Sequence, residues 1–276
     1  MSKKQYLTLE EIKAEELKIL NAFAAFCKMH ELKYSLAGGT LLGAVRHKGF
    51  IPWDDDIDVL MGRPWYDRFL SFRDKFESEH GYRVVAYRGT RIDATPYIKI
   101  VNDSILVKAD IESSLQKLWI DVFPVDGLPE DETDLECLYS RASRLRKAII
   151  VSGVNPSSGS TKAKKIAKVA ARALLSVPGV VAEAGAKLDK LGRAIPYGST
   201  PYVGGLTWGL YGSGERVSYE GFENQTSLPF ENYEFTCMSC WREYLTGLYG
   251  DYMKLPPVNM RVSHDVTAWR VEDGGI

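Results

Sequence analysis

The chain has 276 residues, of which 45% are hydrophobic and 11% aromatic, and its formal net charge is −1. These values are ordinary for a globular protein with a sizeable core, and the near-zero charge argues against a nucleic-acid partner. The first residues are polar and charged, and no apolar stretch approaches the roughly 18 residues of a membrane span, so we expect a cytoplasmic protein without a signal peptide or transmembrane helix.

The first half of the chain predicts helices that alternate with strands. Thr8-Leu9-Glu10-Glu11 is typical of a capping box, which indicates a helix that runs to about Leu32. Pro64 suits the first turn of another helix, which Gly81 would close after about His80. The other expected elements are an extended segment at 34–37, a short helix at 40–46, and strands at 54–61, 82–87, 97–101, 104–108 and 118–123.

The middle of the chain is basic. A helix is expected from about Thr133 to Ser152, followed by a Ser- and Gly-rich loop at 155–160. Residues 141–193 include twelve Lys and Arg but only two acids, and 162–175 predicts a basic amphipathic helix. Its functional interpretation is contact with an anionic membrane surface or a lipid-linked glycan, and the alternative is a solvated helix packed on the core.

The last part of the chain is rich in aromatic residues, Gly and Pro. It predicts a strand or loop at 206–211 and a helix at 241–249. Cys237 and Cys240 have the spacing of a zinc or redox pair, but no second Cys/His pair matches them. Two half-buried thiols on a strand and a turn are the alternative interpretation, so metal binding by this pair stays an open question.

An acidic segment with the sequence Asp54-Asp55-Asp56-Ile57-Asp58 is the most informative feature of the chain. In a strand, Asp56 and Asp58 share one face, and two neighbouring carboxylates repel each other unless a cation lies between them. Hard oxygen ligands of this kind suit Mg²⁺ or Mn²⁺. The preceding glycines, Gly38 and Gly39, can bring backbone N–H groups close to a phosphate. A solvated acidic turn is the simpler alternative, but it does not require the apolar Trp53 and Ile57 among the acids.

Other motifs with acids or glycines fail at specific positions. An EF-hand loop from Asp54 would need Gly and Glu where Val59 and Trp65 stand. The spacing of Gly38 and Gly43 matches a P-loop, but Ala44 follows instead of Lys. The expected strand at 118–123 carries one charged residue, Asp121, among large apolar ones. A carboxylate there is costly unless it is paired or binds a metal, so we predict that Asp121 is the third acid of the site. A structural Asp bonded to loop N–H groups is the alternative.

Four segments carry a family resemblance. The segment from Tyr34 to Val59, with its Gly-Gly turn and Asp-x-Asp, resembles the signature of the LicD family. Residues 119–127 resemble the family's second block, and residues 228–232 and 249–257, with His264 beyond, resemble its C-terminal block. The resemblance covers nearly the whole chain except about 140–195.

The resemblance implies an α+β fold, namely a nucleotidyltransferase-like mixed β-sheet flanked by helices, with a helical basic insertion and an aromatic-rich C-terminal region. We therefore expect a single domain over residues 1–276. Within it, the core would span 1–135, the insertion 136–195, and a part that completes the site 196–276.

The LicD family is associated with transfer of a phospho-alcohol group, typified by phosphocholine from CDP-choline, onto cell-surface glycans or their lipid-linked precursors. Fukutin-type relatives use CDP-ribitol. The resemblance implies that Asp56, Asp58 and Asp121 are the catalytic and metal-binding acids, holding Mg²⁺ or Mn²⁺, with two ions expected as in other two-metal sites. The candidate substrate-binding residues are Gly38, Gly39, Thr40, Arg46, His47, Lys48, Trp53, Asp55, Lys99 and His264.

Two alternative functions stay open at this point. A nucleotidyltransferase would attack the α-phosphate of a nucleoside triphosphate and release pyrophosphate instead of CMP. A non-catalytic glycan-binding protein is the other alternative, although the complete set of three acids argues against it. The donor's alcohol is not encoded in a motif, because a choline head favours an aromatic cage and the chain has 31 aromatic residues to choose from. An acceptor linked to lipid would place the protein peripherally at the inner face of the cytoplasmic membrane.

Overall fold

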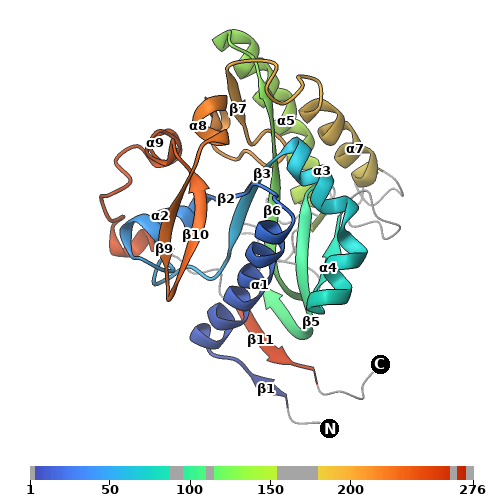
Figure 1. Ribbon diagram of the computed structural model, residues 1–276, viewed down its shortest axis with the longest axis vertical. Helices are drawn as coiled ribbons and strands as arrows, with labels where there is room; N and C mark the ends of the chain where they lie inside the picture. Colours follow the sequence, from blue (N-terminus) through green and yellow to red (C-terminus); the bar gives the residue numbers. More distant parts are fainter. Residues whose placement is uncertain (1–3, 87–95, 110–114, 154–179, 262–265, 272–276) are drawn as a thin grey trace, which may run out of the picture.

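A computed structural model describes residues 4–86, 96–109, 115–153, 180–261 and 266–271, and it places a mixed β-sheet at the centre with helices on its faces (Figure 1). Its main path runs β1-β11-β5-β6-β3-β2, β4 pairs with β5, and β7 and β8 extend the sheet from β6. This confirms a mixed α+β architecture. The strands are β1 (Gln5–Tyr6), β2 (Ser35–Leu36), β3 (Asp58–Gly62), β4 (Arg83–Val85), β5 (Ile98–Ala109), β6 (Gln116–Leu128), β7 (Tyr202–Gly204), β8 (Val217–Ser218) and β11 (Val266–Arg270).

A separate hairpin of β9 (Gln225–Phe230) and β10 (Tyr233–Met238) lies beside α2. The α-helices are α1 (Leu9–Met29), α2 (Gly38–Arg46), α3 (Arg63–Ser71), α4 (Arg73–His80), α5 (Glu132–Gly153), α7 (Val180–Gly192), α8 (Tyr219–Glu223) and α9 (Trp241–Tyr249). Two short 3₁₀ helices are η1 (Gly212–Glu215) and η2 (Val258–Met260). The predicted helix at 241–249 is confirmed to the residue.

Local sequence explains how α1 begins and which face it buries. The predicted capping box is present, because the Thr8 hydroxyl accepts from Glu11 N and the Glu11 carboxylate accepts from Thr8 N at 2.8 Å. The apolar face of α1 includes Ile19 and Phe23, which are fully buried. Phe23 packs edge-on against Phe69 of α3 with ring centroids 5.1 Å apart, so α1 and α3 share one core.

The insertion helices have a core of their own. Leu135, Tyr139 and Ala142 of α5 cluster with Leu188 of α7 and with Leu206, which lies in the loop after β7. The described part of the basic region therefore packs by its apolar residues. The expected loop at 155–160 and helix at 162–175 lie outside the described residues, as does His264.

Three predicted elements differ from the structure. The strand expected at 54–61 begins only at Asp58, because Asp54 N donates to Ile51 O at 2.9 Å and closes a turn that poor strand formers favour. The helix expected from Pro64 to His80 is two helices, α3 and α4, which meet at Phe72. The strands expected at 97–101 and 104–108 are one strand, β5, whose pairing with β6 shifts register between Asn102 and Leu106.

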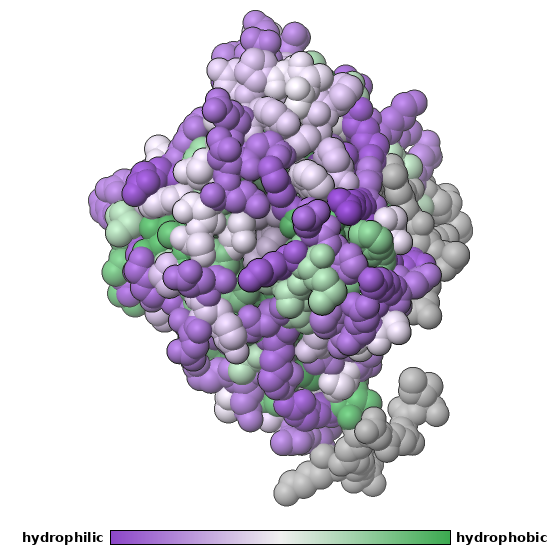
Figure 2. All heavy atoms as spheres, viewed as in Figure 1, coloured by the Kyte–Doolittle hydropathy of each residue, from purple (hydrophilic) through white to green (hydrophobic). Residues whose placement is uncertain are grey.

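Smaller differences concern element ends. The first helix ends at Met29 instead of Leu32, and α2 begins at Gly38, two residues before the expected start at Thr40. Strand β6 continues well past Phe123 to Leu128. None of the described helices is long and apolar enough to cross a bilayer. The face in Figure 2 is mostly hydrophilic, with apolar side chains gathered at its left edge, on the side where Figure 1 places α2.

Candidate active site

Three neighbouring strands bring two acids and a lysine together. Asp58, the first residue of β3, lies in parallel register with Asp121 of β6. On the other side of β6, Lys99 of β5 lies in antiparallel register with the same Asp121. Two further backbone bonds fix this edge, from Asp121 N to Ile57 O at 2.9 Å and from Ala37 N to Asp58 O at 3.0 Å. The predicted juxtaposition of Asp58 and Asp121 is thus built by strand pairing.

Asp56 reaches the same cavity from the loop before β3, and not from the strand itself. Lys13 of α1 holds that loop, because its Nζ donates to Ile51 O at 3.3 Å and to Pro52 O at 3.2 Å. Lys13 is 6% exposed, so these bonds lie in the interior. The prediction that Asp56 and Asp58 share a strand face is wrong, but both carboxylates line one cavity.

Burial and mutual repulsion set the electrostatics of the acids. Burial raises the pKa of Asp58 well above its usual range, and the neighbouring charges of Asp56 and Asp121 raise it further. Burial also raises the pKa of Asp121, and Lys99 opposes that rise. The Lys99 Nζ is 3.7 Å from Asp121 Oδ1 and 3.7 Å from the ring centroid of Trp119. One lysine therefore faces an acidic cluster that it does not neutralise.

A further acid, contributed by α1, is buried near the cluster. Glu16 of α1 is 3% exposed, and its Oε2 has no hydrogen-bond partner. Burial raises the pKa of Glu16 well above its usual range, and Asp56, Asp55 and Asp121 add to the effect in that order. Sequence analysis missed Glu16, because its spacing on α1 shows only that it shares the buried face of a helix.

The Gly-Gly turn is required by close approach to the acids. Gly38 has a φ of +48°, and a Cβ there would also come 3.3 Å from Asp58 Oδ2. At Gly39, a Cβ would stand 2.6 Å from Asp54 Oδ2. The Thr40 hydroxyl accepts from Asp58 N at 2.9 Å, so this residue fixes the start of β3. Of the three residues predicted to approach phosphates, Gly38 is the one that lines the acidic cavity.

The acidic cavity has a volume of about 180 Å³ and a second wall that the sequence did not predict. Asp56, Asp58 and Asp121 form one part of its lining. Trp208, Tyr211 and Glu215 approach from the segment between β7 and β8, and Tyr244 and Leu248 approach from α9. The hydroxyl of Tyr244 accepts from Gly38 N at 3.4 Å, which links α9 to the Gly-Gly turn.

A larger cavity of about 500 Å³ lies on the other side of the Gly-Gly turn. Its lining includes Gly39, Arg46, Trp53, Asp54 and Lys254. The Arg46 Nη1 donates to Tyr252 O at 3.0 Å, and Arg46 Nε donates to His47 Nε2 at 2.9 Å. Arg46 and Trp53 therefore line one site, next to the acids but separate from the acidic cavity.

Five of the predicted substrate-binding residues line neither cavity, namely Thr40, His47, Lys48, Asp55 and Lys99. Asp55 is 6% exposed and therefore points into the interior. Lys48 is exposed with a φ of +61°, and its Nζ donates to Val45 O at 3.4 Å. His47 contacts the second cavity only indirectly, through Arg46 and an edge-on contact with Trp53 whose ring centroids are 6.2 Å apart.

Comparison with known proteins shows which family the chain belongs to. Residues 31–150 match a family model described as the LicD/FKTN/FKRP nucleotidyltransferase domain. The lipopolysaccharide cholinephosphotransferase LicD of Haemophilus influenzae is 32% identical over 263 residues, which cover 94% of this chain and 97% of that protein. The chain belongs to the LicD family. An uncharacterized protein of Rickettsia prowazekii, RP689, is 41% identical over 66 residues, 20% of this chain and 25% of that protein.

The matched LicD domain contains only part of the site. Asp56, Asp58, Lys99 and Asp121 all lie within residues 31–150, whereas Glu215 lies beyond them. The identity to the Haemophilus protein extends over nearly the whole chain, so the second wall lies within a region that also has a counterpart in that relative. The LicD resemblance inferred from the sequence is confirmed.

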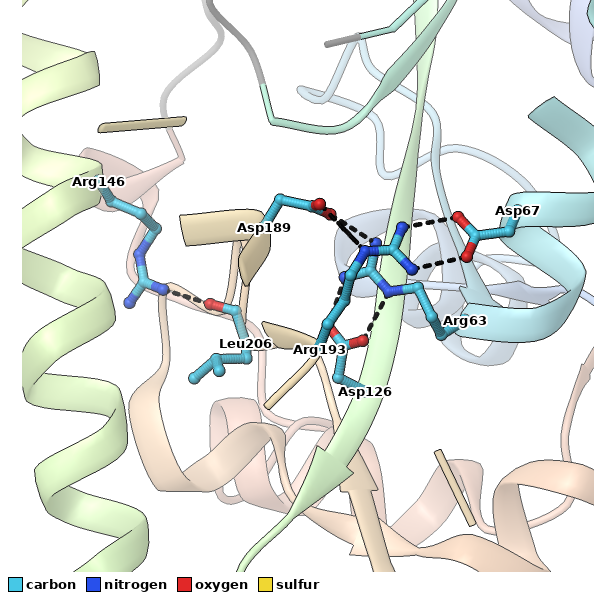
Figure 3. A network of polar contacts seen from close by, with 7 residues as sticks. All are labelled: Arg63, Asp67, Asp126, Arg146, Asp189, Arg193 and Leu206. Carbon is cyan, nitrogen blue, oxygen red and sulfur yellow. Dashed lines mark hydrogen bonds and ion pairs between the residues drawn. The ribbon is translucent and has the colours of Figure 1, made fainter. Parts of the chain in front are cut away.

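A buried ion-pair network attaches the insertion of this LicD chain to its core (Figure 3). Arg63, at the start of α3, donates twice to the Asp126 carboxylate of β6, each at 2.6 Å, and once to Asp189 of α7 at 3.0 Å. Arg193 continues the network from Asp189 to Asp67 on α3, with bonds of 2.6 and 2.7 Å to the Asp67 carboxylate. Helices α3 and α7 are thereby held on one strand.

The chain has two candidate metal sites, the Cys237–Cys240 pair and the acid cluster, and the structure favours the acid cluster. Cys237 is buried on β10 and Cys240 is partly buried just before α9, and burial raises the pKa of each thiol to about 12, which favours the interpretation as structural thiols. Across the described residues, no three His, Cys, Asp or Glu side chains are arranged to hold a metal ion together. The acid cluster nevertheless offers hard oxygen donors, and the buried Asp121 Oδ1 has no hydrogen-bond partner.

Proposed function

We propose that the chain transfers phosphocholine from CDP-choline to a hydroxyl of a cell-surface glycan, such as lipopolysaccharide or its lipid-linked precursor, and releases CMP. The observation that carries this proposal is the 32% identity, over 94% of the chain, to a lipopolysaccharide cholinephosphotransferase. The paired acids of β3 and β6 support it, because they lie where a nucleotidyltransferase-like fold would present its Asp-x-Asp strand and its third acid.

The acid cluster offers the kind of oxygen donors that a divalent cation binds. Asp58 and Asp121 lie side by side with raised pKa values, which is the electrostatic state that a bound cation would relieve. The oxygens of Asp56, Asp58 and Asp121 would hold Mg²⁺ or Mn²⁺, two ions in our proposal. Bound there, a divalent metal would neutralise charge on the donor's diphosphate as the leaving CMP departs.

The chain's own residues would position and deprotonate the acceptor. The acceptor oxygen forms a bond to the phosphorus that carries choline, while the bond from that phosphorus to the bridging oxygen of CMP breaks. Asp121 is the acid proposed to accept the hydroxyl proton, because it lines the acidic cavity, and burial raises its pKa in the absence of a metal. Lys99, 3.7 Å from Asp121 Oδ1, would limit that rise and orient the carboxylate.

The larger cavity is proposed to receive the cytidine monophosphate half of the donor. Arg46 and Lys254 supply positive charge there, and the indole of Trp53 supplies an aromatic face for a base. The Arg261 guanidinium lies 4.9 Å from the Trp53 ring centroid and adds to the positive charge. Gly38 lines the acidic cavity and Gly39 lines the larger one, so the diphosphate would pass along the Gly-Gly turn from one cavity to the other.

A donor screen tests this proposal. Purified protein with Mg²⁺ is incubated separately with CDP-choline, CDP-ethanolamine, CDP-glycerol, CDP-ribitol and each nucleoside triphosphate, with Asp58→Asn as the control. CMP released from CDP-choline by the wild-type protein alone is the expected result. Pyrophosphate released from a triphosphate would instead identify a nucleotidyltransferase, and release of neither product, with or without a lipopolysaccharide acceptor, would contradict a catalytic role.

A further inference from the structure

The acidic cavity is built in two layers along the same pair of strands. Asp58 pairs with Asp121, and two residues further on Leu60 pairs with Phe123. Residues two apart on a strand point to the same face, about 7 Å apart at 3.3 Å per residue. Leu60 and Phe123 both line the cavity, so they form its floor immediately beyond the acids.

The second layer is covered by aromatic rings and one acid. Tyr97 packs against both Phe123 and Trp208, with ring centroids 4.6 and 4.9 Å away, so it links the floor to the Trp208 ring. Tyr211 adds a ring from the same segment, and Glu215 brings a carboxylate that is 6% exposed. The cavity's lining contains no Lys, Arg or His among the described residues. Aromatic faces around a buried negative charge attract a cation.

Interactions outside the cavity hold this layer in place. Glu215 Oε1 accepts from Tyr211 N at 3.4 Å, which ties the acid to the ring beside it. Arg146 of α5, 4% exposed, donates to Leu206 O at 2.6 Å and so fixes the segment that carries Trp208 (Figure 3). The Arg146 guanidinium is thus engaged with the backbone of the wall and is not part of the cavity lining, and its charge opposes the rise that burial causes in the pKa of Glu215.

The chemistry of the layer discriminates between alcohols. A polyol would need several hydrogen-bond partners, and a primary ammonium would need acceptors for three N–H donors. The layer offers ring faces, one carboxylate and apolar side chains, which suit a cation that carries methyl groups and no donors. The floor of the layer lies two residues beyond the acids along β3 and β6, roughly 7 Å, and a choline ester has only a two-carbon linker between its phosphate and its nitrogen.

We propose that Trp208, Tyr211 and Glu215 form a head-group pocket that binds the quaternary ammonium of choline and selects it over neutral alcohols. The inference rests on the proposed function, because the head group is that of the donor. It assigns specificity to a segment outside the matched family domain. The acids of β3 and β6 would hold the phosphate end of the same molecule.

Equilibrium binding tests the pocket without catalysis. Titration calorimetry or ligand-observed NMR would measure the binding of choline and of its neutral analogue 3,3-dimethylbutan-1-ol. The proteins compared are wild type, Trp208→Leu, Trp208→Phe and Glu215→Gln. The control is Glu243→Gln, on the exposed face of α9. Wild type, Trp208→Phe and the control should bind choline in preference to the neutral analogue. Trp208→Leu and Glu215→Gln should weaken choline binding at least tenfold. The proposed pocket is wrong if the wild-type protein binds both alcohols equally, or if Trp208→Leu and Glu215→Gln both bind choline as the wild type does.

Donor kinetics separate this inference from the proposed function. The ratio of kcat/KM for CDP-choline to that for CDP-glycerol should fall at least tenfold in Glu215→Gln, mainly through KM. If wild type releases CMP from no donor while choline binding still depends on Trp208 and Glu215, the proposed function fails and the pocket stands. If CMP is released and the variants keep the wild-type ratio, the pocket fails and the function stands. Circular dichroism checks folding, and Glu215→Gln decides the matter if Trp208→Leu does not fold.

Discussion

Asp58 and Asp121 lie directly opposite each other on β3 and β6, the one parallel pair of strands in the described part of the sheet. Parallel pairing places both residues at matching positions of two strands that run in the same direction. Two carboxylates at this position make each other harder to ionise. Their ionised forms therefore destabilise the folded protein at this edge of the sheet. Residues arranged against stability in this way are candidates for function.

Replacing Asp58 by Asn should separate activity from stability. The change removes one of two repelling charges, so the free energy of unfolding at pH 8 should stay level or rise by about 1 kcal/mol. CMP release should fall by about two orders of magnitude or more, since metal-assisted charge stabilisation contributes several kcal/mol. Urea unfolding and the CMP assay check this, with the exposed Asp134→Asn as control. A large loss of stability would mean that Asp58 is structural.

Replacing Glu215 by Gln should stabilise the protein in a pH-dependent way. Burial raises the pKa of Glu215 from its ordinary 4.5 to about 7, so the folded state holds the proton more tightly than the unfolded state. Stability conferred by this proton is complete below pH 4.5 and is lost as pH rises through 7. At pH 8 the glutamine variant should therefore gain up to about 3 kcal/mol, at roughly 1.4 kcal/mol per pKa unit.

The check on Glu215→Gln is a series of urea unfolding curves at several pH values between 5 and 8.5. The difference between variant and wild type should grow through this window and level off above pH 7. A constant difference across the window would show that Glu215 does not titrate there.

Replacing Arg63 by Met should be strongly destabilising. The change leaves the Asp126 carboxylate, 1% exposed, without its bidentate partner, and breaking a buried pair in this way costs about 3–5 kcal/mol. The matched control is Lys187→Met, because the Lys187–Glu183 pair on α7 is exposed and should contribute little to stability. Urea unfolding of both variants measures the contrast, and similar losses would mean that Asp126 finds another partner.

Two glycines of the wall should respond differently to alanine. A methyl group at Gly209 would overlap the Gly205 carbonyl oxygen, so Gly209→Ala should cost about 1–3 kcal/mol and disturb the segment around Trp208. At Gly205 the nearest atom to a new Cβ is Glu215 Oε2 at 3.4 Å, an ordinary contact, so Gly205→Ala should change stability little. Melting temperatures of the two variants check this, and equal shifts would place the backbone of this wall differently.

The sequence predicted the acids of the cavity, but not the wall opposite them that contains Trp208 and Glu215. Asp121 could be predicted because a single carboxylate in an apolar strand is a local anomaly, and strand pairing then placed it beside Asp58. Asp56 was expected on the strand, yet the turn at Asp54 ends the extended run, since local hydrogen bonds of Asp compete with strand formation. The site residues themselves stay predictions until variants are measured.

Glu215 and Trp208 carry no such local signal. They lie in a Gly-rich segment without helical or strand periodicity, and nothing near them in sequence indicates burial beside the acids. Their position depends on β7 pairing with β6 and on Arg146 holding Leu206, which are contacts across 60 or more residues of the chain. Only the tertiary structure identifies them. The sequence alone therefore could not show which of its 31 aromatic residues would surround a choline head group.

The bond from Arg146 to Leu206 O has a consequence for how this protein could be engineered or could diverge. Helix α5 lies almost wholly within the matched family domain, and it fastens the backbone that carries Trp208 in the segment beyond that domain. Exchanging α5 between relatives would therefore also change the support of the backbone that carries Trp208. A chimera that keeps every lining side chain, but receives a foreign α5, could inherit a different donor preference.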